Sequence, residues 1–204
     1  MQVIKSTYSQ LTMVGLILST MLITGIVTAQ DSMPLQFSML DMPGEIIGSN
    51  QIHRKKLSFD TNELVYVVPA NVYHGKNQEA IRITTKDDEC LIALRLLTTT
   101  TNELSNQLNT LVSQQFPANT NLENVPLTIL GQSGSGYRFN NQVANLTQII
   151  YVYLVPTSMC IFEITLYCMP KSENQALAVL NEFLLSFQSN AQGPIIIKPR
   201  SEAS

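Results

Sequence analysis

The chain has 204 residues and a formal net charge of −3, with 12 basic and 15 acidic side chains. Hydrophobic residues make up 45% and charged residues only 13%, so we expect a polar but weakly charged surface. The only basic run, residues 53–56, is short. The charge balance therefore excludes binding to a nucleic-acid backbone, and the length suits one domain with a sizeable core.

Residues 1–29 have the pattern of a cleavable secretory signal. One charge, at Lys5, precedes the uncharged stretch 11–29, which ends in Val27, Thr28 and Ala29. Small side chains at the last position and two places earlier suit the pocket of a signal peptidase. We expect cleavage after Ala29, export to the periplasm or the cell exterior, and no stable membrane insertion afterwards. The alternative is a retained anchor, since the stretch approaches the ~20 residues that span a bilayer.

The first half of the mature chain reads mainly as strands. Residues 35–75 are strand-like but irregular, with His74 expected in a loop because Gly and Asn surround it. The clearest hairpin follows, where two β-rich runs flank the polar turn 86–89. Residues 100–103 have the sequence of a capping box. Apolar residues at helical spacing then predict an amphipathic helix from Leu104 to Phe116, ended by Pro117.

The second half predicts a long hairpin and a final helix. We expect the glycine-rich stretch 131–136 to be a flexible turn, because neither a Lys-Ser/Thr pair nor a helix follows it, as a phosphate loop requires. Residues 146–155 and 159–168 are apolar on both faces, which predicts a sheet covered on each side. Residues 172–175 predict a second capping box and a helix to about Gln188. The expected organisation is a single α+β domain at 30–188 and a flexible tail at 189–204.

Three motifs resemble the PsbP-like family, which includes a lumenal photosystem subunit and exported bacterial relatives. They are the strand-to-helix passage "LLTTTTNELSNQL", the strand "GSGYRFN", and the helix end "LLSF". The resemblance covers about residues 57–189. It implies an antiparallel sheet flanked by helices on both faces, an α/β/α sandwich, and usually no catalysis. It implies no particular partner.

The mature chain contains three cysteines, Cys90, Cys160 and Cys168, so at most one internal disulfide can form. If 160–168 is one strand, its ends lie about 26 Å apart at ~3.3 Å per residue, too far for a bridge. We expect three reduced, buried thiols; a disulfide between Cys90 and Cys168 is the alternative. The two histidines, His53 and His74, lie in no motif, so we expect no catalytic residue, no metal site and no cofactor.

Glu163 is a lone carboxylate inside an apolar strand. We expect it to be paired with Arg138 or Arg95, or to lie at a sheet edge. The alternative is a shallow ligand surface, whose members would be Glu163, Thr165, Tyr167, Tyr151 and Tyr153. Whether the last two tyrosines share its face depends on the hairpin register, because one residue of slip exchanges the faces.

A secretory signal without a catalytic constellation predicts an exported, non-enzymatic accessory or binding module with a protein partner. A small-ligand binder, using a groove between sheet and helix, is the first alternative. A hydrolase of unrecognised type is the second. A homo-oligomer is compatible with each of these.

Overall fold

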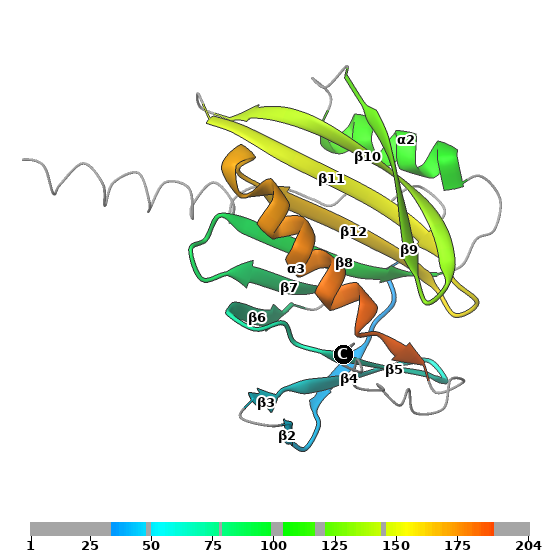
Figure 1. Ribbon diagram of the computed structural model, residues 1–204. Helices are drawn as coiled ribbons and strands as arrows, with labels where there is room; N and C mark the ends of the chain where they lie inside the picture. The colour runs from blue at the N-terminus through cyan, green and yellow to red at the C-terminus, as the bar shows by residue number, and fades with distance from the viewer. Residues whose placement is uncertain are drawn as a thin grey trace, which may run out of the picture.

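The computed structural model describes residues 34–47, 50–77, 79–98, 104–116, 121–143 and 146–189 (Figure 1). The expected signal segment, the first capping box and the tail from residue 190 lie outside these ranges. In chain order, the elements are β1 (Ser38–Asp41), β2 (Glu45–Ile47), β3 (Asn50–Ile52), β4 (Arg54–Phe59), β5 (Asn62–Val67), β6 (Val72–Lys76), β7 (Ala80–Thr85), β8 (Cys90–Leu97), α2 (Leu104–Gln115), β9 (Glu123–Ile129), β10 (Gln132–Val143), β11 (Leu146–Pro156), β12 (Ile161–Cys168), the 3-10 turn η1 (Pro170–Ser172), α3 (Glu173–Leu185) and β13 (Gln188–Ser189).

The main sheet has seven strands in the order β6-β7-β8-β12-β11-β10-β9. A second sheet has the order β1-β4-β5-β13, and β2 pairs with β3 as a small separate hairpin. All strand pairs within the described ranges are antiparallel. The prediction of an α+β fold with an antiparallel sheet and two helices is confirmed.

The central strands are buried along their whole length. Every side chain of β8 and β12 is buried. Side chains that alternate along β12 join two different clusters: Phe162, Ile164 and Leu166 pack in the cluster that contains α3, whereas Ile161 and Tyr167 pack in the cluster that contains α2. The prediction that side chains on both faces of the long hairpin are buried is therefore confirmed.

Helix α3 joins the two sheets through aromatic side chains. The ring of Phe187, just after the helix, lies 5.6 Å from Phe162 of the main sheet and 5.2 Å from Tyr66 of the second sheet. Phe183 packs edge-on against Tyr66 at 5.2 Å. Aromatic pairs at these distances stabilise a core beyond their buried area. In Figure 1, the C-terminal end of α3 accordingly lies beside β5.

The glycine-rich stretch is a strand rather than a flexible turn. Only Gly131, with φ +77°, belongs to the turn between β9 and β10. An added Cβ would stand 2.2 Å from a ring carbon of Tyr153 at Gly136, and 2.6 Å from a methyl of Val155 at Gly134. Both glycines are therefore required because the backbone and side chains of β11 lie too close to β10 for a Cβ atom at these positions.

The second capping box does not form. Ser172 precedes α3, but it makes no cap hydrogen bond, and its hydroxyl donates to the carboxylate of Glu89 instead. The helix ends at Leu185, before the predicted end, and the Ser186 hydroxyl donates to the carbonyl of Phe183 (2.6 Å). The chain can then enter β13, which pairs with β5.

Two further features bear on the predictions. His74 lies inside strand β6 and not in a loop, because β6 pairs with β7 across His74 and the residues on either side. Neither helix within the described ranges has the length and hydropathy needed to cross a bilayer.

Candidate functional site

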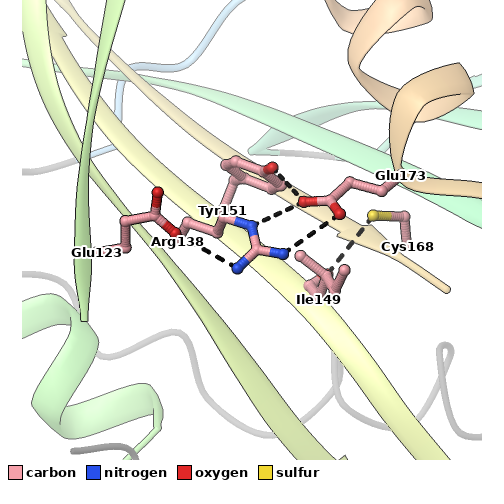
Figure 2. Close-up of polar contacts among 6 residues, drawn as sticks. All are labelled: Glu123, Arg138, Ile149, Tyr151, Cys168 and Glu173. Atoms are coloured by element: carbon pink, nitrogen blue, oxygen red, sulfur yellow. Dashed lines mark hydrogen bonds and ion pairs between the residues drawn. The ribbon is translucent and has the colours of Figure 1, made fainter. Parts of the chain in front are cut away.

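A polar cluster lies where the main sheet meets the start of α3 (Figure 2). The antiparallel register places Arg138 of β10 opposite Tyr151 of β11 on one side and opposite Glu123 of β9 on the other. Glu173 is the first residue of α3. The cluster is thus assembled from three neighbouring strands and one helix terminus.

Arg138 is held by two carboxylates. Its Nε donates to Glu173 Oε1 at 2.7 Å and its Nη2 to Glu173 Oε2 at 3.2 Å, a bidentate arrangement. Its Nη1 reaches Glu123 Oε2 at 3.4 Å. The Tyr151 hydroxyl also donates to Glu173 Oε1, at 2.5 Å. The hydrogen bonds between Arg138 and Glu173 lower the pKa of the Glu173 carboxyl group and raise the pKa of the Arg138 guanidinium.

The tyrosines beside the cluster are rigidly placed. Tyr151 and Tyr153 stack with ring centroids 5.9 Å apart, and the ring of Tyr153 lies over Gly136. Burial, followed by the hydrogen bond to Glu173, raises the pKa of Tyr151 to about 12. This phenol therefore stays protonated at neutral pH and serves as a donor.

Cys168 lies beside this cluster. Its Sγ lies 3.8 Å from the carbonyl oxygen of Ile149, and burial raises its pKa to about 12 (Figure 2). A nucleophilic cysteine needs a lowered pKa and a base. The arrangement can fix α3 to the sheet and present a half-exposed, net negative polar surface, but it does not generate a nucleophile.

A second ion pair is buried on the opposite face of the sheet. Arg95 of β8 stands opposite Glu163 of β12. Its Nε donates to Glu163 Oε1 at 3.0 Å and its Nη2 to Oε1 and Oε2 at 2.6 and 2.5 Å. Burial raises the pKa of Glu163, while the charge and hydrogen bonds of Arg95 oppose that rise. The expectation that Glu163 is paired is met by Arg95; Arg138 binds Glu173 instead.

The five residues expected to form one ligand surface lie on two faces. Glu163 is opposite Leu154, whereas Tyr151 and Tyr153 are opposite Leu166 and Ile164. Because directly paired residues share a face, both tyrosines face α3. Glu163, Thr165 and Tyr167 lie on the other face, and Tyr167 packs in the cluster of α2, with its ring 6.4 Å from Phe116. The register thus divides the five residues between the two faces of the sheet.

His74 takes part in a different contact. Its Nε2 lies 2.7 Å from the Tyr66 hydroxyl, which also approaches Met39 Sδ at 3.3 Å. Burial lowers the pKa of His74, so the imidazole is mostly neutral near pH 7. This contact joins β6 to β5 and β1. Among the described residues, no group of three or more His, Cys, Asp or Glu could hold a metal ion.

Sequence reasoning missed the Arg138–Glu173 contact. The pattern of residues 172–175 predicts only a capping box and gives Glu173 no partner. Arg138 lies in the mostly polar strand QSGSGYRFNNQV, so the local sequence does not mark it as part of a cluster. The partner's identity depends on how α3 crosses the sheet, which local sequence does not encode.

No protein-family model matches the chain, and no curated protein matches it in sequence. Among solved structures, it is similar to LpqN of Mycobacterium tuberculosis, which is involved in cell envelope biogenesis, at 10% identity and a TM-score of 0.44, covering 75% of this chain and 91% of that one. It is also similar to cyanobacterial PsbP of Synechocystis, at 10% identity and a TM-score of 0.45, covering 72% and 98%.

A third similar structure is a protein of Bacteroides thetaiotaomicron, at 7% identity and a TM-score of 0.43, covering 64% of this chain and 46% of that one. The chain thus spans less than half of that protein. One of these similar structures is a PsbP protein, and PsbP-like proteins are the family that the sequence motifs resemble.

Proposed function

We propose that this chain is an exported, non-enzymatic accessory module of PsbP-like α/β/α architecture that binds a protein partner through its surface. The observation that carries the proposal is the position of the reactive groups. The three thiols are buried with raised pKa values, and the buried carboxylate of Glu163 is neutralised by Arg95. These reactive side chains contribute to the packing of the core, so we assign the function to the surface of the protein.

The binding surface that we propose lies at the end of the molecule formed by β1, β2, β3 and β6, on the far side from α2 (Figure 1). Three large apolar side chains are exposed there: Leu40 of β1, Ile46 of β2 and Tyr73 of β6, at 59%, 75% and 59%. The neighbouring residues Met39 and His74 both contact the Tyr66 hydroxyl, so β1 and β6 are held together. We propose that these three side chains form one patch, because contiguous exposed apolar patches mark interaction sites.

Affinity capture tests this proposal. The tagged mature chain is mixed with envelope and culture fractions of the producing cells, beside a Leu40→Ser/Tyr73→Ser variant and a Leu185→Ser control. Leu185 is 83% exposed at the end of α3, so its loss removes apolar surface elsewhere. We expect one protein to be retained by the wild type and the control and lost by the double variant. Equal retention by all three would contradict the proposed surface.

Export is tested separately by fractionating cells that express the full chain. We expect the protein in the periplasm or the medium, with an N-terminus at Gln30. A cytoplasmic protein with an intact N-terminus would contradict export.

A further inference from the structure

Two of the three cysteines are paired across adjacent inner strands of the main sheet, at one end of these strands. Cys90 is the first residue of β8 and Cys168 the last residue of β12, and the register places them directly opposite. Both are buried, at 2% and 3% exposure, and both are free thiols. Cys160 lies before the other end of β12, with its carbonyl bound to Thr157, so it is remote from this pair.

The backbone pattern defines which kind of cross-strand pair this is. One residue further along, the Met169 N–H donates to the Glu89 carbonyl at 3.2 Å. Hydrogen-bonded and non-hydrogen-bonded pairs alternate in an antiparallel ladder, so Cys90 and Cys168 form a non-hydrogen-bonded pair. Such pairs have Cα atoms ~4.5 Å apart with their side chains on the same face, within the roughly 4.4 to 6.8 Å that a disulfide requires.

We propose that Cys90 and Cys168 are the site of a cross-strand disulfide in the exported protein. The two thiols together lose two protons and two electrons as the S–S bond forms. The electrons reduce the disulfide of a thiol-oxidising protein or a small disulfide such as oxidised glutathione to two thiols. The formation of this disulfide in the cell rests on the proposed export, because disulfides persist in oxidising compartments.

The bond would form during folding. Burial raises the pKa of both thiols to about 12, so thiolate is scarce once β8 and β12 have closed. After closure, the disulfide would fix β12 at the point where the chain turns into η1 and α3. The enclosed loop, on the order of 80 residues, contains α2 and strands β9 to β11, so its closure restricts the unfolded chain strongly.

Refolding in a glutathione redox buffer tests the cysteine pair without any need for export. The denatured mature chain is refolded with reduced and oxidised glutathione. It is then unfolded in a denaturant without reductant, its free thiols are labelled with iodoacetamide, and its mass is measured by mass spectrometry. We expect one labelled thiol per chain, and a tryptic peptide 87–95 joined to peptide 139–171. Three labelled thiols, or a free 87–95 peptide, would overturn the proposal.

Two variants identify the partner of Cys90. Cys160→Ala should carry no labelled thiol and still contain the joined peptides, whereas Cys168→Ala should carry two labelled thiols. A joined peptide that disappears in Cys160→Ala would overturn the assignment, even if Cys168→Ala failed to fold.

Reduction should lower the thermal midpoint of the wild type by about 10 °C and leave that of Cys168→Ala unchanged. A cytoplasmic location would contradict export alone and leave these results standing.

Discussion

The two arginine–carboxylate pairs of this protein have the same chemistry in opposite surroundings. The side chains of Arg95 and Glu163 are 4% and 5% exposed, whereas those of Arg138 and Glu173 are 26% and 23% exposed. The pKa shifts differ accordingly. Burial raises the pKa of Glu163, while hydrogen bonds from Arg138 lower the pKa of Glu173. Solvent access, and not the partner, decides which effect dominates.

The difference separates two structural roles. The buried pair lies between the central strands, where desolvation offsets most of the attraction, so it adds little stability compared with apolar residues. The half-exposed pair connects α3 to β10 and retains solvation. The first pair is costly to break and the second is cheap to break, and variants can measure that contrast.

The largest expected effect is that of Glu163→Leu. This variant leaves Arg95 buried without its counter-charge, and a guanidinium cannot lose its proton to escape the cost. Arg95 already has a buried Nη1 that finds no partner within the described ranges. We expect the free energy of unfolding in urea to fall by about 3–5 kcal/mol.

Two further variants sharpen this result. Arg95→Met should cost less than Glu163→Leu, because the remaining carboxyl group has a raised pKa and can take up a proton. The double variant Arg95→Met/Glu163→Leu should recover most of the lost stability, since no unpaired charge remains. A double variant as unstable as Glu163→Leu would show that the site depends on polar contacts and not on charge balance.

The next effect concerns the backbone beneath the half-exposed cluster. In Gly136→Ala, the new methyl would meet the Tyr153 ring and the Val152 carbonyl, which cannot both move away. We expect a loss of about 1–3 kcal/mol in the free energy of unfolding. Gly75→Ala is the matched control, because nothing lies within 4 Å of its added methyl. Equal losses in the two variants would contradict a requirement for close approach at Gly136.

A smaller effect is expected for the half-exposed pair itself. Glu173→Gln keeps the shape of the side chain but removes the charge that Arg138 binds. Since both side chains retain solvent contact, the loss should be about 1 kcal/mol in urea, and added salt should reduce it. Tyr151→Phe removes only one donor and provides the control. A loss for Glu173→Gln as large as that for Glu163→Leu would abolish the distinction between the two pairs.

The sequence predicts the local elements of this protein better than their relations. The stripe of α2 is recognisable because Leu108, Leu111 and Val112 recur at helical spacing, and all three are buried. The two-sided burial of β12 is recognisable because Glu163 is the only ionised residue in an apolar run. Both signals are properties of neighbouring residues, so no knowledge of the tertiary fold is needed.

The features that escaped prediction depend on register and packing. Gly134 and Gly136 resemble turn residues until the backbone and side chains of β11 are placed beside them. Tyr151 could face either helix until the turn length of the hairpin is fixed. Ser172 satisfies the pattern of a cap, but its hydroxyl donates to Glu89, which is distant in the sequence. Long-range partners compete with local motifs, and the local sequence records only the motif.

The last prediction uses pH, and the two carboxylates should respond with opposite sign. A carboxylate with a lowered folded pKa stabilises the protein above its unfolded pKa, and this contribution is lost as pH falls through the folded value. The stability difference between wild type and Glu173→Gln should therefore shrink below about pH 4.5, by at most about 1 kcal/mol. Glu163 has a raised pKa, so folding favours its protonated form. Relative to Glu163→Gln, the wild type should lose stability as pH rises from about 4.5 towards the folded pKa. Urea titrations between pH 3 and 8 measure both differences, and slopes of the same sign would contradict the assignment of one buried and one solvated pair.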